Sequence, residues 1–335
     1  MGNGPGFPSA AGRRLPPAWF NGAMIVSFTP NPAVDKTLQV RPLHVGEVNR
    51  ALDSHLDPGG KGINVSRVVH RLGGTTCALG VLGGHMGRLL QRALRDEGVP
   101  FEFVWIEAET RLNVILHDQT TGRGTRVWDR GPIADAACVE RLEDLLERRL
   151  EGAAVFVTTG SLLRGMPADF HRTWIVRARE RGVATILDAD GQWLEQAIDA
   201  APDVIKPNTD EAAALLGRPL PTEEDVVAAG PELCARGPRA VVISRGAAGS
   251  ILTTAGRAFR AVPPQIELRS TVGSGDSMVA GLALALARRE PLEDGLRVGT
   301  AAGAATAATI STSLASADDV RSLLSQVRVE EIRKA

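Results

Sequence analysis

A glycine-rich loop followed at once by an acidic residue is the segment of this sequence best suited to chemistry. Residues 271–276 read Thr-Val-Gly-Ser-Gly-Asp, and an apolar run begins directly after them. Glycines allow a tight turn that aims backbone N–H groups at one point, where the positive end of a following helix adds to them. The segment predicts an anion hole, with Asp276 as a base that accepts a proton from an alcohol. Its residues are Gly273, Ser274 and Gly275. Standing alone, the same pattern also fits a helix that Asp276 merely caps.

A second segment has the residue types that bind a polyhydroxy compound. It reads Asp-Pro-Gly-Gly-Lys-Gly-Ile-Asn from residue 57 and runs into a predicted helix. Two consecutive glycines let a small ligand touch the backbone, and Asn64 offers donors and acceptors to hydroxyl groups. A carboxylate after the first predicted strand can accept hydrogen bonds from two hydroxyls. The candidate sugar ligands are Asp35, Gly59, Gly60 and Asn64. A structural turn that starts a helix remains an alternative for the glycines.

A third segment combines a cation, an amide and a carboxylate at the end of a predicted strand. Lys206, Asn208 and Glu211 suit the phosphates and metal ion of a nucleotide. Asn208 and Glu211 also have the spacing of a capping box, in which each side chain bonds the backbone of the other. A fourth segment, 242–249, runs from a strand into a glycine-containing turn. The lysine and glycine spacing of a P-loop and the glycine pattern of a dinucleotide fold are both absent from the sequence.

The elements that must position these segments alternate along the chain. Short apolar runs predict strands at 24–28, 76–82, 154–158, 184–188, 203–206, 240–244 and 250–253. Amphipathic stretches predict helices at 61–72, 87–97, 135–150, 167–181, 209–216, 223–236, 275–289 and 292–310. Such alternation predicts an α/β fold with a mainly parallel sheet covered on both faces. The last helix is rich in Ala and Gly, which suits close approach to a neighbouring backbone or to a flat ligand.

Two regions interrupt the alternation. Residues 34–56 and 101–128 contain strand-like runs without intervening helices, and 114–117 and 125–128 flank a predicted hairpin turn. We interpret these regions as a small β-sheet that forms a lid on the main domain. The domain plan is a disordered extension at 1–23, a single domain at 24–328 and a C-terminal tail at 329–335.

The composition of the chain excludes several function classes. With 38 basic and 39 acidic side chains the formal net charge is −1, so no strong field favours nucleic acid or an acidic membrane. The three cysteines, Cys77, Cys138 and Cys234, lack metal-ligand spacing and indicate a reducing compartment. No apolar run approaches the roughly 20 residues of a membrane span. We therefore expect a cytoplasmic protein.

Taken together, the four segments resemble the PfkB (ribokinase-like) carbohydrate kinase family. The resemblance spans about residues 24–328, with the segments in the family's order and spacing. It implies a three-layer α/β/α fold with a β-sheet lid, and transfer of phosphate from Mg-ATP to a sugar hydroxyl. The Thr-Pro-Asn-Pro-Ala-Val-Asp run at 29–35 and the Thr-Arg-Leu-Asn run at 110–113 are most similar to the branch that phosphorylates sugar phosphates. That branch comprises 1-phosphofructokinase, the minor 6-phosphofructokinase and tagatose-6-phosphate kinase.

The resemblance assigns roles to further residues. Arg111 suits a phosphate already present on the sugar, because a guanidinium can bind it through two hydrogen bonds. The remaining sugar-phosphate contacts implied are Lys61, Asn113 and Ser161. The ATP-binding residues implied are Lys206, Asn208, Ser244, Gly246, Gly249 and Thr271. The Mg²⁺ ligands implied are Asp188 and Glu211.

The chain departs from the family in two places. A leucine, Leu163, replaces the proline that usually follows the Gly-Ser-Leu run at 160–162, which leaves the geometry around Ser161 open and raises the question of whether Arg164 adds a phosphate contact. Asp190 stands where the family usually has a small polar residue, and it either alters metal binding or faces solvent.

The leading hypothesis is ATP-dependent phosphorylation of a ketohexose phosphate by a homodimer that pairs through the lid. Fructose 1-phosphate is the favoured acceptor, with fructose 6-phosphate and tagatose 6-phosphate as further possibilities. One alternative is a kinase of the same fold that acts on an unphosphorylated sugar or nucleoside. Another is a sugar-phosphate sensor without catalytic activity, although a sensor has no use for the base Asp276.

Overall fold

The large sheet organises the molecule. The computed structural model describes residues 23–309 and 313–333. Ten strands form this sheet in the order β14-β13-β12-β11-β10-β9-β8-β1-β4-β5. In chain order they are β1 (Met24–Thr29), β4 (Thr76–Gly83), β5 (Phe101–Ile106), β8 (Ala153–Thr159), β9 (Ala184–Asp188), β10 (Val204–Ile205), β11 (Ala240–Ser244), β12 (Ser250–Thr254), β13 (Arg257–Val262) and β14 (Arg328–Arg333). All eight residues of β4 are buried, as expected of a strand covered on both faces.

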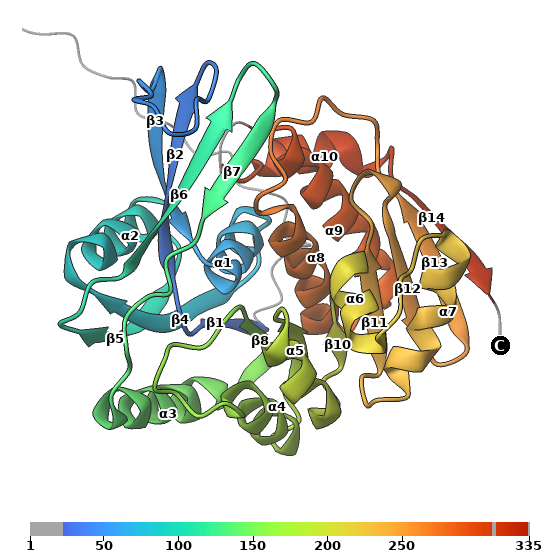
Figure 1. Ribbon diagram of the computed structural model, residues 1–335. Coiled ribbons are helices and arrows are strands. Elements are labelled where there is room, and N and C mark those ends of the chain that lie inside the picture. The colour runs from blue at the N-terminus through green and yellow to red at the C-terminus, as the bar shows by residue number, and fades with distance from the viewer. Residues whose placement is uncertain (1–22, 310–312, 334–335) are drawn as a thin grey trace, which may run out of the picture.

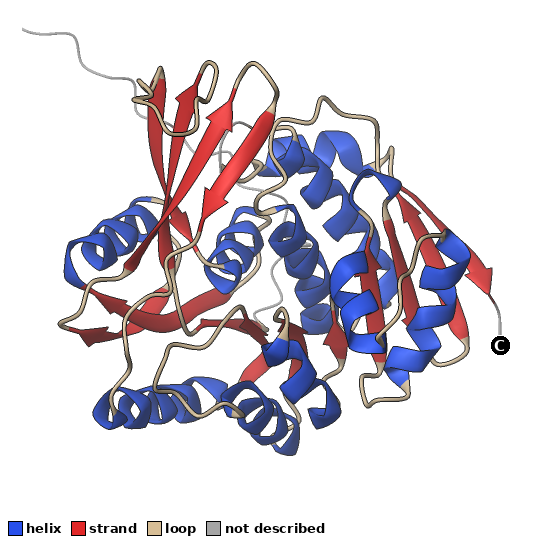
Figure 2. Ribbon diagram, viewed as in Figure 1, coloured by secondary structure: helices blue, strands red, loops and turns tan. Residues whose placement is uncertain are grey.

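Helices cover both faces of this sheet (Figure 2). On one face lie α1 (Lys61–Arg71), α8 (Ser274–Arg288), α9 (Leu292–Ala307) and α10 (Ala317–Leu324). On the other face lie α3 (Ala136–Leu150), α4 (Phe170–Glu180), α5 (Gln192–Ala197), α6 (Thr209–Leu216) and α7 (Glu223–Cys234). The helix α2 (Gly84–Asp96) packs against β4 and the second sheet. The predicted three-layer α/β/α fold is confirmed.

The strand order places a topological switch point beside β1. From β1 the chain passes to β4 and β5 on one side, and then crosses back to β8 on the other side of β1. From β8 the parallel strands continue through β9 and β10 to β11. Ligands of open parallel sheets bind at the carboxyl ends of the strands near such a switch. The residues that end these strands are Thr29, Thr159, Asp188 and Ser244, and Lys206 directly follows β10.

A pair of glycines brings α8 and α9 into backbone contact. A Cβ atom built on Gly281 of α8 would lie 2.3 Å from the backbone nitrogen of Gly299 in α9. A Cβ on Gly299 would lie 2.6 Å from the carbonyl oxygen of Met278. Side chains at either position would force the helices apart. The Ala- and Gly-rich helix predicted from the sequence therefore packs against a neighbouring helix. This backbone contact fixes the position of α8, and with it the position of its first turn.

The second sheet has four strands in the order β3-β2-β6-β7 and rises above the large sheet (Figure 1). It comprises β2 (Ala33–Val40), β3 (Asp53–Gly59), β6 (Arg111–Asp118) and β7 (Arg123–Val127). β6 and β7 form the antiparallel hairpin predicted from the sequence. The pairing of β2 with β6 is parallel and sets Asp35 opposite Asn113 and Ala33 opposite Arg111.

Two predicted boundaries are wrong. Residues 101–106 were assigned to the lid, but they form β5, which pairs with β4 at the edge of the large sheet. The predicted tail at 329–335 overlaps β14, which pairs with β13 and so belongs to the domain. Short, charged edge strands and short helices carry weak sequence patterns, which is why β13, β14, α5 and α10 were not predicted. Positions 1–22, 310–312 and 334–335 of the predicted plan lie outside the described residues.

No helix in the described part of the chain combines the length and apolar character that crossing a bilayer requires.

Candidate active site

Asp276 lies in the first turn of α8 and is almost entirely buried, with 8% of its surface exposed. The amide nitrogen of Asn64, from α1, donates a hydrogen bond of 2.8 Å to its Oδ2 atom. Burial and the nearby Asp188 carboxylate raise the pKa of Asp276 to about 6, against the lowering effects of Asn64, Lys61 and Lys206. A carboxylate with a pKa near the working pH is well suited to accept a proton.

The start of α8 has the backbone features that the predicted anion hole requires. Gly273 precedes the helix with a φ of 79°, a left-handed conformation that favours glycine, and no side chain caps the first turn. The N–H groups of that turn are therefore available to an anion. A Cβ atom on Gly275 would lie 3.3 Å from the Nζ atom of Lys206, so the glycine gives the lysine room beside the helix end. Ser274, the first residue of α8, carries a buried hydroxyl with no hydrogen-bond partner in the described chain.

Two lysines meet the carboxylate at the end of β9. Lys61 donates to Oδ1 of Asp188 over 3.2 Å, and Lys206 lies 3.6 Å from the same atom. Burial alone would raise the pKa of Asp188, but the two lysines outweigh it and hold that pKa below its usual range. Asp190 faces solvent and lies 3.5 Å from Lys61. The cluster therefore places two ammonium groups around an ionised Asp188.

Glu211 and Asn208 form the capping box predicted for the start of α6. The backbone N–H of Asn208 donates to Oε2 of Glu211 over 2.8 Å. Burial raises the pKa of Glu211, and this hydrogen bond opposes the effect.

Within residues 23–309 and 313–333 no cluster of three or more acidic, His or Cys side chains forms a ready-made metal site. Magnesium does not require one, because it binds through one or two carboxylates and completes its shell with water and phosphate oxygens. Asp188 and Glu211 are close enough for their charges to affect each other, and they fit that pattern.

The lid sheet holds the predicted sugar ligands on its inner strands. Asn113 of β6 donates a hydrogen bond of 2.8 Å to Oδ1 of Asp35 on β2, as their register requires. Gly59 has no room for a side chain, because its Cβ position would lie 2.6 Å from Oδ2 of Asp35. The glycine at 59 is therefore needed to seat the carboxylate, whereas we had expected it to expose backbone to a ligand. Gly60 immediately precedes α1 with a φ of 118°.

Arg111 and Ser161 converge on Asn31, which follows β1. Arg111 donates to the carbonyl oxygen of Asn31 over 2.8 Å and to that of Asp129 over 3.0 Å. The amide nitrogen of Asn31 reaches the Ser161 hydroxyl at 3.5 Å and the carbonyl oxygen of Arg130 at 3.1 Å. Two polar atoms of this group, Nε of Arg111 and Oδ1 of Asn31, are buried without a partner in the described structure. Such atoms are suited to a polar ligand.

Hydrogen bonds from both sides hold the Ser161 loop, which lacks the proline. The backbone oxygen of Arg164 accepts from the N–H of Ala134, and its guanidinium donates to the carbonyl of Gly131 over 2.9 Å. On the other side, buried His171 bonds both Thr158 and the carbonyl oxygen of Gly160. Burial lowers the pKa of His171 to about 4, so the imidazole is neutral. The described contacts use Arg164 to fix the loop.

The predicted nucleotide loops lie on the opposite side of Asp276 from the lid. Ser244 ends β11 and bridges to Asn208, while Gly246 and Gly249 bound the short turn before β12. The hydroxyl of Thr271 accepts a hydrogen bond of 3.0 Å from Arg126 of β7. The lid thus reaches the segment that precedes the anion hole.

All these features fit a phosphotransferase, and comparison with known proteins assigns the family. The model of the pfkB family carbohydrate kinases matches residues 29–319. The chain belongs to this family. The prediction of a kinase that phosphorylates a sugar hydroxyl is thereby confirmed.

Relatives within the family cover nearly the whole chain. ATP-dependent 6-phosphofructokinase isozyme 2 of Mycobacterium tuberculosis is 37% identical over 91% of this chain and 90% of its own length. The 1-phosphofructokinase of Bacillus subtilis is 33% identical over 92% of this chain and 100% of its own length. The structure of phosphofructokinase-2 from Escherichia coli in complex with substrates and products superposes with a TM-score of 0.86. The two chains are 32% identical, with 91% of this chain and 99% of that one covered.

Four residues of this PfkB kinase were not singled out from the sequence. Asn31 lies inside the run at 29–35 that indicated the branch, so that motif could have identified it. Arg126 carries no local signal, because it contacts Thr271 from a strand distant in sequence. Arg67 and His171 lie near the site residues that they contact, Asn64 and Gly160, but no motif singled them out.

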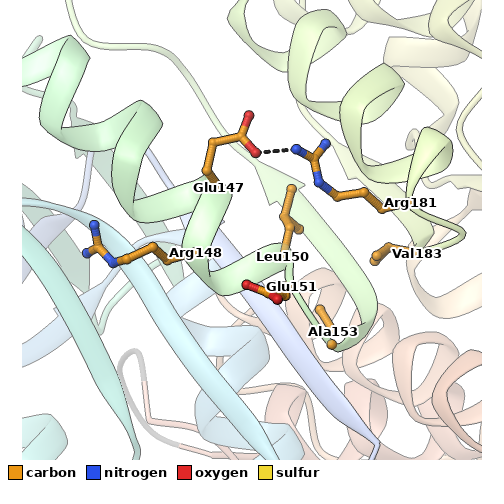
Figure 3. Close-up of a pocket in the computed structure, with 8 residues that line it drawn as sticks. Glu147, Arg148, Leu150, Glu151, Ala153, Arg181 and Val183 are labelled. Carbon is orange, nitrogen blue, oxygen red and sulfur yellow. Dashed lines mark hydrogen bonds and ion pairs between the residues drawn. The ribbon is translucent and has the colours of Figure 1, made fainter.

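The cavity of about 630 Å³ drawn in Figure 3 lies away from these residues. It is lined by the segment 150–153 before β8, by Val183 before β9, and by Glu147 paired with Arg181. These are the amino ends of the strands, whereas the candidate site occupies the carboxyl ends. The candidate site residues instead lie at the carboxyl ends of the large sheet's strands and on the lid sheet.

Proposed function

We propose that this kinase transfers the γ-phosphoryl group of ATP to a hydroxyl of a ketohexose phosphate. The observation that supports this proposal is a buried carboxylate with a raised pKa, Asp276, in the first turn of a helix whose start is uncapped. A lid arginine, Arg111, adds a buried Nε–H that lacks a partner in the described structure. The first two features serve phosphoryl transfer, and the third serves a substrate that already carries a phosphate.

Asp276 acts as the general base in this proposal. It accepts the proton of the acceptor hydroxyl as that oxygen attacks the γ-phosphorus of ATP, and the bond to the β-phosphate oxygen breaks to release ADP. Asn64 holds the carboxylate in place through its 2.8 Å hydrogen bond. A pKa of about 6 leaves most of the group ionised at neutral pH.

The start of α8 and the two lysines stabilise the transferring group. Backbone N–H groups at 273–276 face the charge that develops on the phosphoryl oxygens, and Lys206 adds its ammonium group beside Gly275. Asp188 and Glu211 would hold Mg²⁺, which neutralises charge on the ATP phosphates. Phosphoryl transfer depends on positioning and electrostatics, so closure of the lid over the site serves to exclude water.

The sugar phosphate lies under the lid in this proposal. Asp35 and Asn113 bind sugar hydroxyls from adjacent strands, while Arg111 and Ser161 bind the phosphate already present. Nε–H of Arg111 has no partner in the described structure and is a donor for a phosphate oxygen, while each terminal nitrogen bonds one carbonyl, of Asn31 or Asp129. A neutral sugar would leave that buried donor unpaired.

Fructose 1-phosphate is our first choice of acceptor and fructose 6-phosphate our second. Phosphorylation of the first at O6 and of the second at O1 gives the same product, fructose 1,6-bisphosphate, so product analysis does not distinguish them. A coupled ADP-release assay with these two esters, tagatose 6-phosphate, ribose and adenosine does. We expect kcat/KM for one ketohexose phosphate to exceed that for ribose and adenosine by at least about 10³-fold, the scale set by unpaired buried polar groups. Equal rates with ribose would refute the phosphate-directed site, and absence of ADP release with every acceptor would refute the function.

We also propose a homodimer that pairs through the lid. The loop after β2 exposes Val45 and Val48 at 94% and 89% of their surface, and β7 is followed by the exposed Trp128. An apolar lid surface with open strand edges favours pairing with a second copy. Light scattering of the protein in solution should give twice the mass of the 335-residue chain, and Val48→Asp combined with Trp128→Asp should give the mass of one chain. A monomeric parent protein would contradict the proposal.

A further inference from the structure

Arg67 is a buried cation that the proposed reaction does not use. It lies in α1 with 3% of its surface exposed. Its Nε and one terminal nitrogen bond Glu97, the shortest of these contacts being 2.6 Å. The other terminal nitrogen lies 3.3 Å from the carbonyl oxygen of Pro58 and 3.3 Å from Oδ1 of Asn64. Arg67 is thus clamped at one end by Glu97 and faces Asn64 at the other.

Asn64 stands between Arg67 and the base. It lies three residues before Arg67 on the same face of α1, so the two side chains are neighbours. Its Oδ1 faces Arg67, and its Nδ2 donates to Asp276 over 2.8 Å. An amide side chain has an acceptor at one end and a donor at the other, whereas arginine has donors only. Asn64 can therefore accept a hydrogen bond from Arg67 in only one of the two orientations of its amide.

We propose that Arg67 is a positioning residue for catalysis: it holds the Asn64 amide in the orientation that donates to Asp276. The proposal rests on the proposed role of Asp276 as general base. In the opposite orientation Oδ1 of Asn64 would face the carboxyl group and accept a hydrogen bond from its protonated form. Arg67 excludes that state, because it would place the Nδ2 donor against the guanidinium.

The consequence is a link between Arg67 and the protonation of the base. Without Arg67 the amide is free to turn, and the turned amide stabilises protonated Asp276, which raises its pKa further. The other charged groups that face Asp276 are Asp188 at the end of β9, Lys61 from α1 and Lys206 after β10. Their contacts with one another do not involve Arg67, so a substitution at 67 leaves them in place.

The test compares Arg67→Met with Arg71→Met in the full-length enzyme. Arg71 is the matched control, because it also pairs with Glu97, at 3.0 Å, but directs its other nitrogen to backbone carbonyls at 314 and 315. The measurement is kcat/KM for the best sugar phosphate as a function of pH. In Arg67→Met we expect the acid limb of the kcat/KM–pH profile to move up by about one pH unit. The value of kcat/KM should then fall about fivefold at pH 6 and hardly at pH 8. Arg71→Met should leave the limb in place. An unmoved limb in Arg67→Met, or an equal shift in Arg71→Met, overturns the proposal.

A second variant shows whether Arg67 acts through Asn64. In an Asn64→Ala background, where no amide can turn, Arg67→Met should produce no further shift of the limb. A full additional shift there would mean that the charge of Arg67 acts on Asp276 directly, and the proposal would fail. Should Arg67→Met not fold, Arg67→Lys carries the test. It keeps a cation beside Glu97 but lacks the fork that spans to Asn64, so we expect a smaller shift in the same direction.

A readout without turnover separates this inference from the proposed function. The unfolding free energies of the wild type and Asp276→Asn, compared across pH, report the pKa of Asp276. Repeating the comparison in the Arg67→Met background should move the pH at which the two curves diverge upward by about one unit. A wild type that phosphorylates no acceptor would refute the proposed function while this shift remains measurable. An active wild type with an unmoved divergence would refute the role of Arg67 alone.

Discussion

The base side and the lid side of the candidate site are built in different ways. On the base side, Asp188 ends β9, Lys206 follows β10 and Asp276 lies in α8, which packs on the same sheet, and all three are buried. On the lid side, Asp35 and Asn113 are joined across two strands of a small sheet whose outer strand β7 is exposed along its length. The difference teaches that the proposed chemistry is anchored in a buried part of the molecule, while the proposed substrate recognition is carried by a more exposed part. Changes on the base side should lower kcat, and changes on the lid should raise KM.

The largest expected effect is that of Asp276→Asn. The variant keeps the shape of the side chain and its contact with Asn64, but it cannot accept the proton. We expect kcat to fall about 10²–10⁴-fold with little change in KM, the range assigned to general-base assistance. Steady-state kinetics with the best acceptor checks this. A kcat within threefold of the wild type would remove Asp276 from the mechanism.

Arg111→Ala should act on the other side of the comparison. Removing a charged donor to the substrate phosphate should raise KM for a ketohexose phosphate by about 10–100-fold, as expected for a lost charge-assisted hydrogen bond. The KM for ATP should stay the same, because Arg111 belongs to the lid. A kcat loss without a KM change would contradict the division between the two sides. The matched control is Arg123→Ala, an exposed arginine at the far end of the same sheet.

The raised pKa of Asp276 should also make the unfolding free energy of the protein depend on pH. Its folded-state pKa of about 6 lies above the ordinary value of 3.8 for an aspartate, so the folded form binds the proton more tightly and loses stability as pH rises through this window. Asp276→Asn removes that loss. Its stability relative to the wild type should therefore grow by about 1–2 kcal/mol between pH 5 and pH 8. Chemical denaturation at the two pH values measures it, and a constant difference would show that the carboxylate is not perturbed.

Asn113→Ala should give the smallest effect. It removes one hydrogen bond to Asp35 and leaves the carboxylate free to bind the sugar in several orientations. We expect KM for the acceptor to rise about three- to tenfold and the pH profile to stay unchanged, since the base is elsewhere. A shifted acid limb in this variant would mean that the lid and the base side are coupled more tightly than their separate construction indicates.

The sequence predicted the base side of the fold better than the lid. Each strand that ends at or just before Asp188, Lys206 or Ser244 is a short apolar run followed by polar residues, and this local pattern is sufficient. The capping box at 208–211 was likewise predicted from spacing and is present. Residues 101–106 show the limit of this local pattern. An apolar run predicts a strand, but its own residues do not specify which of two sheets the strand joins. The same holds for β14, where pairing with β13 depends on the whole chain returning to that edge.

The contacts between site residues were the least predictable. Asn64 was expected to bind sugar hydroxyls, yet both ends of its amide are engaged with Asp276 and Arg67. Gly59 was read as a surface for a ligand and instead accommodates Asp35. In each case the partner lies on another element, and one sequence does not record which residues meet. The roles proposed for Lys61, Ser161 and Thr271 in substrate binding stay predictions.

The glycine contact between α8 and α9 sets a rule for anyone who engineers this enzyme. Replacing a helical glycine with alanine ordinarily stabilises a protein by roughly 1 kcal/mol, so design procedures favour it. At Gly281 the added methyl group would overlap Gly299, because its carbon would lie 2.3 Å from the backbone nitrogen of Gly299. Alanine at this position would therefore destabilise the protein instead of stabilising it. Relief of the overlap would shift the first turn of α8 and the residues that follow it. Thermostabilising libraries should therefore hold these two positions constant and seek their gains on the outer helices.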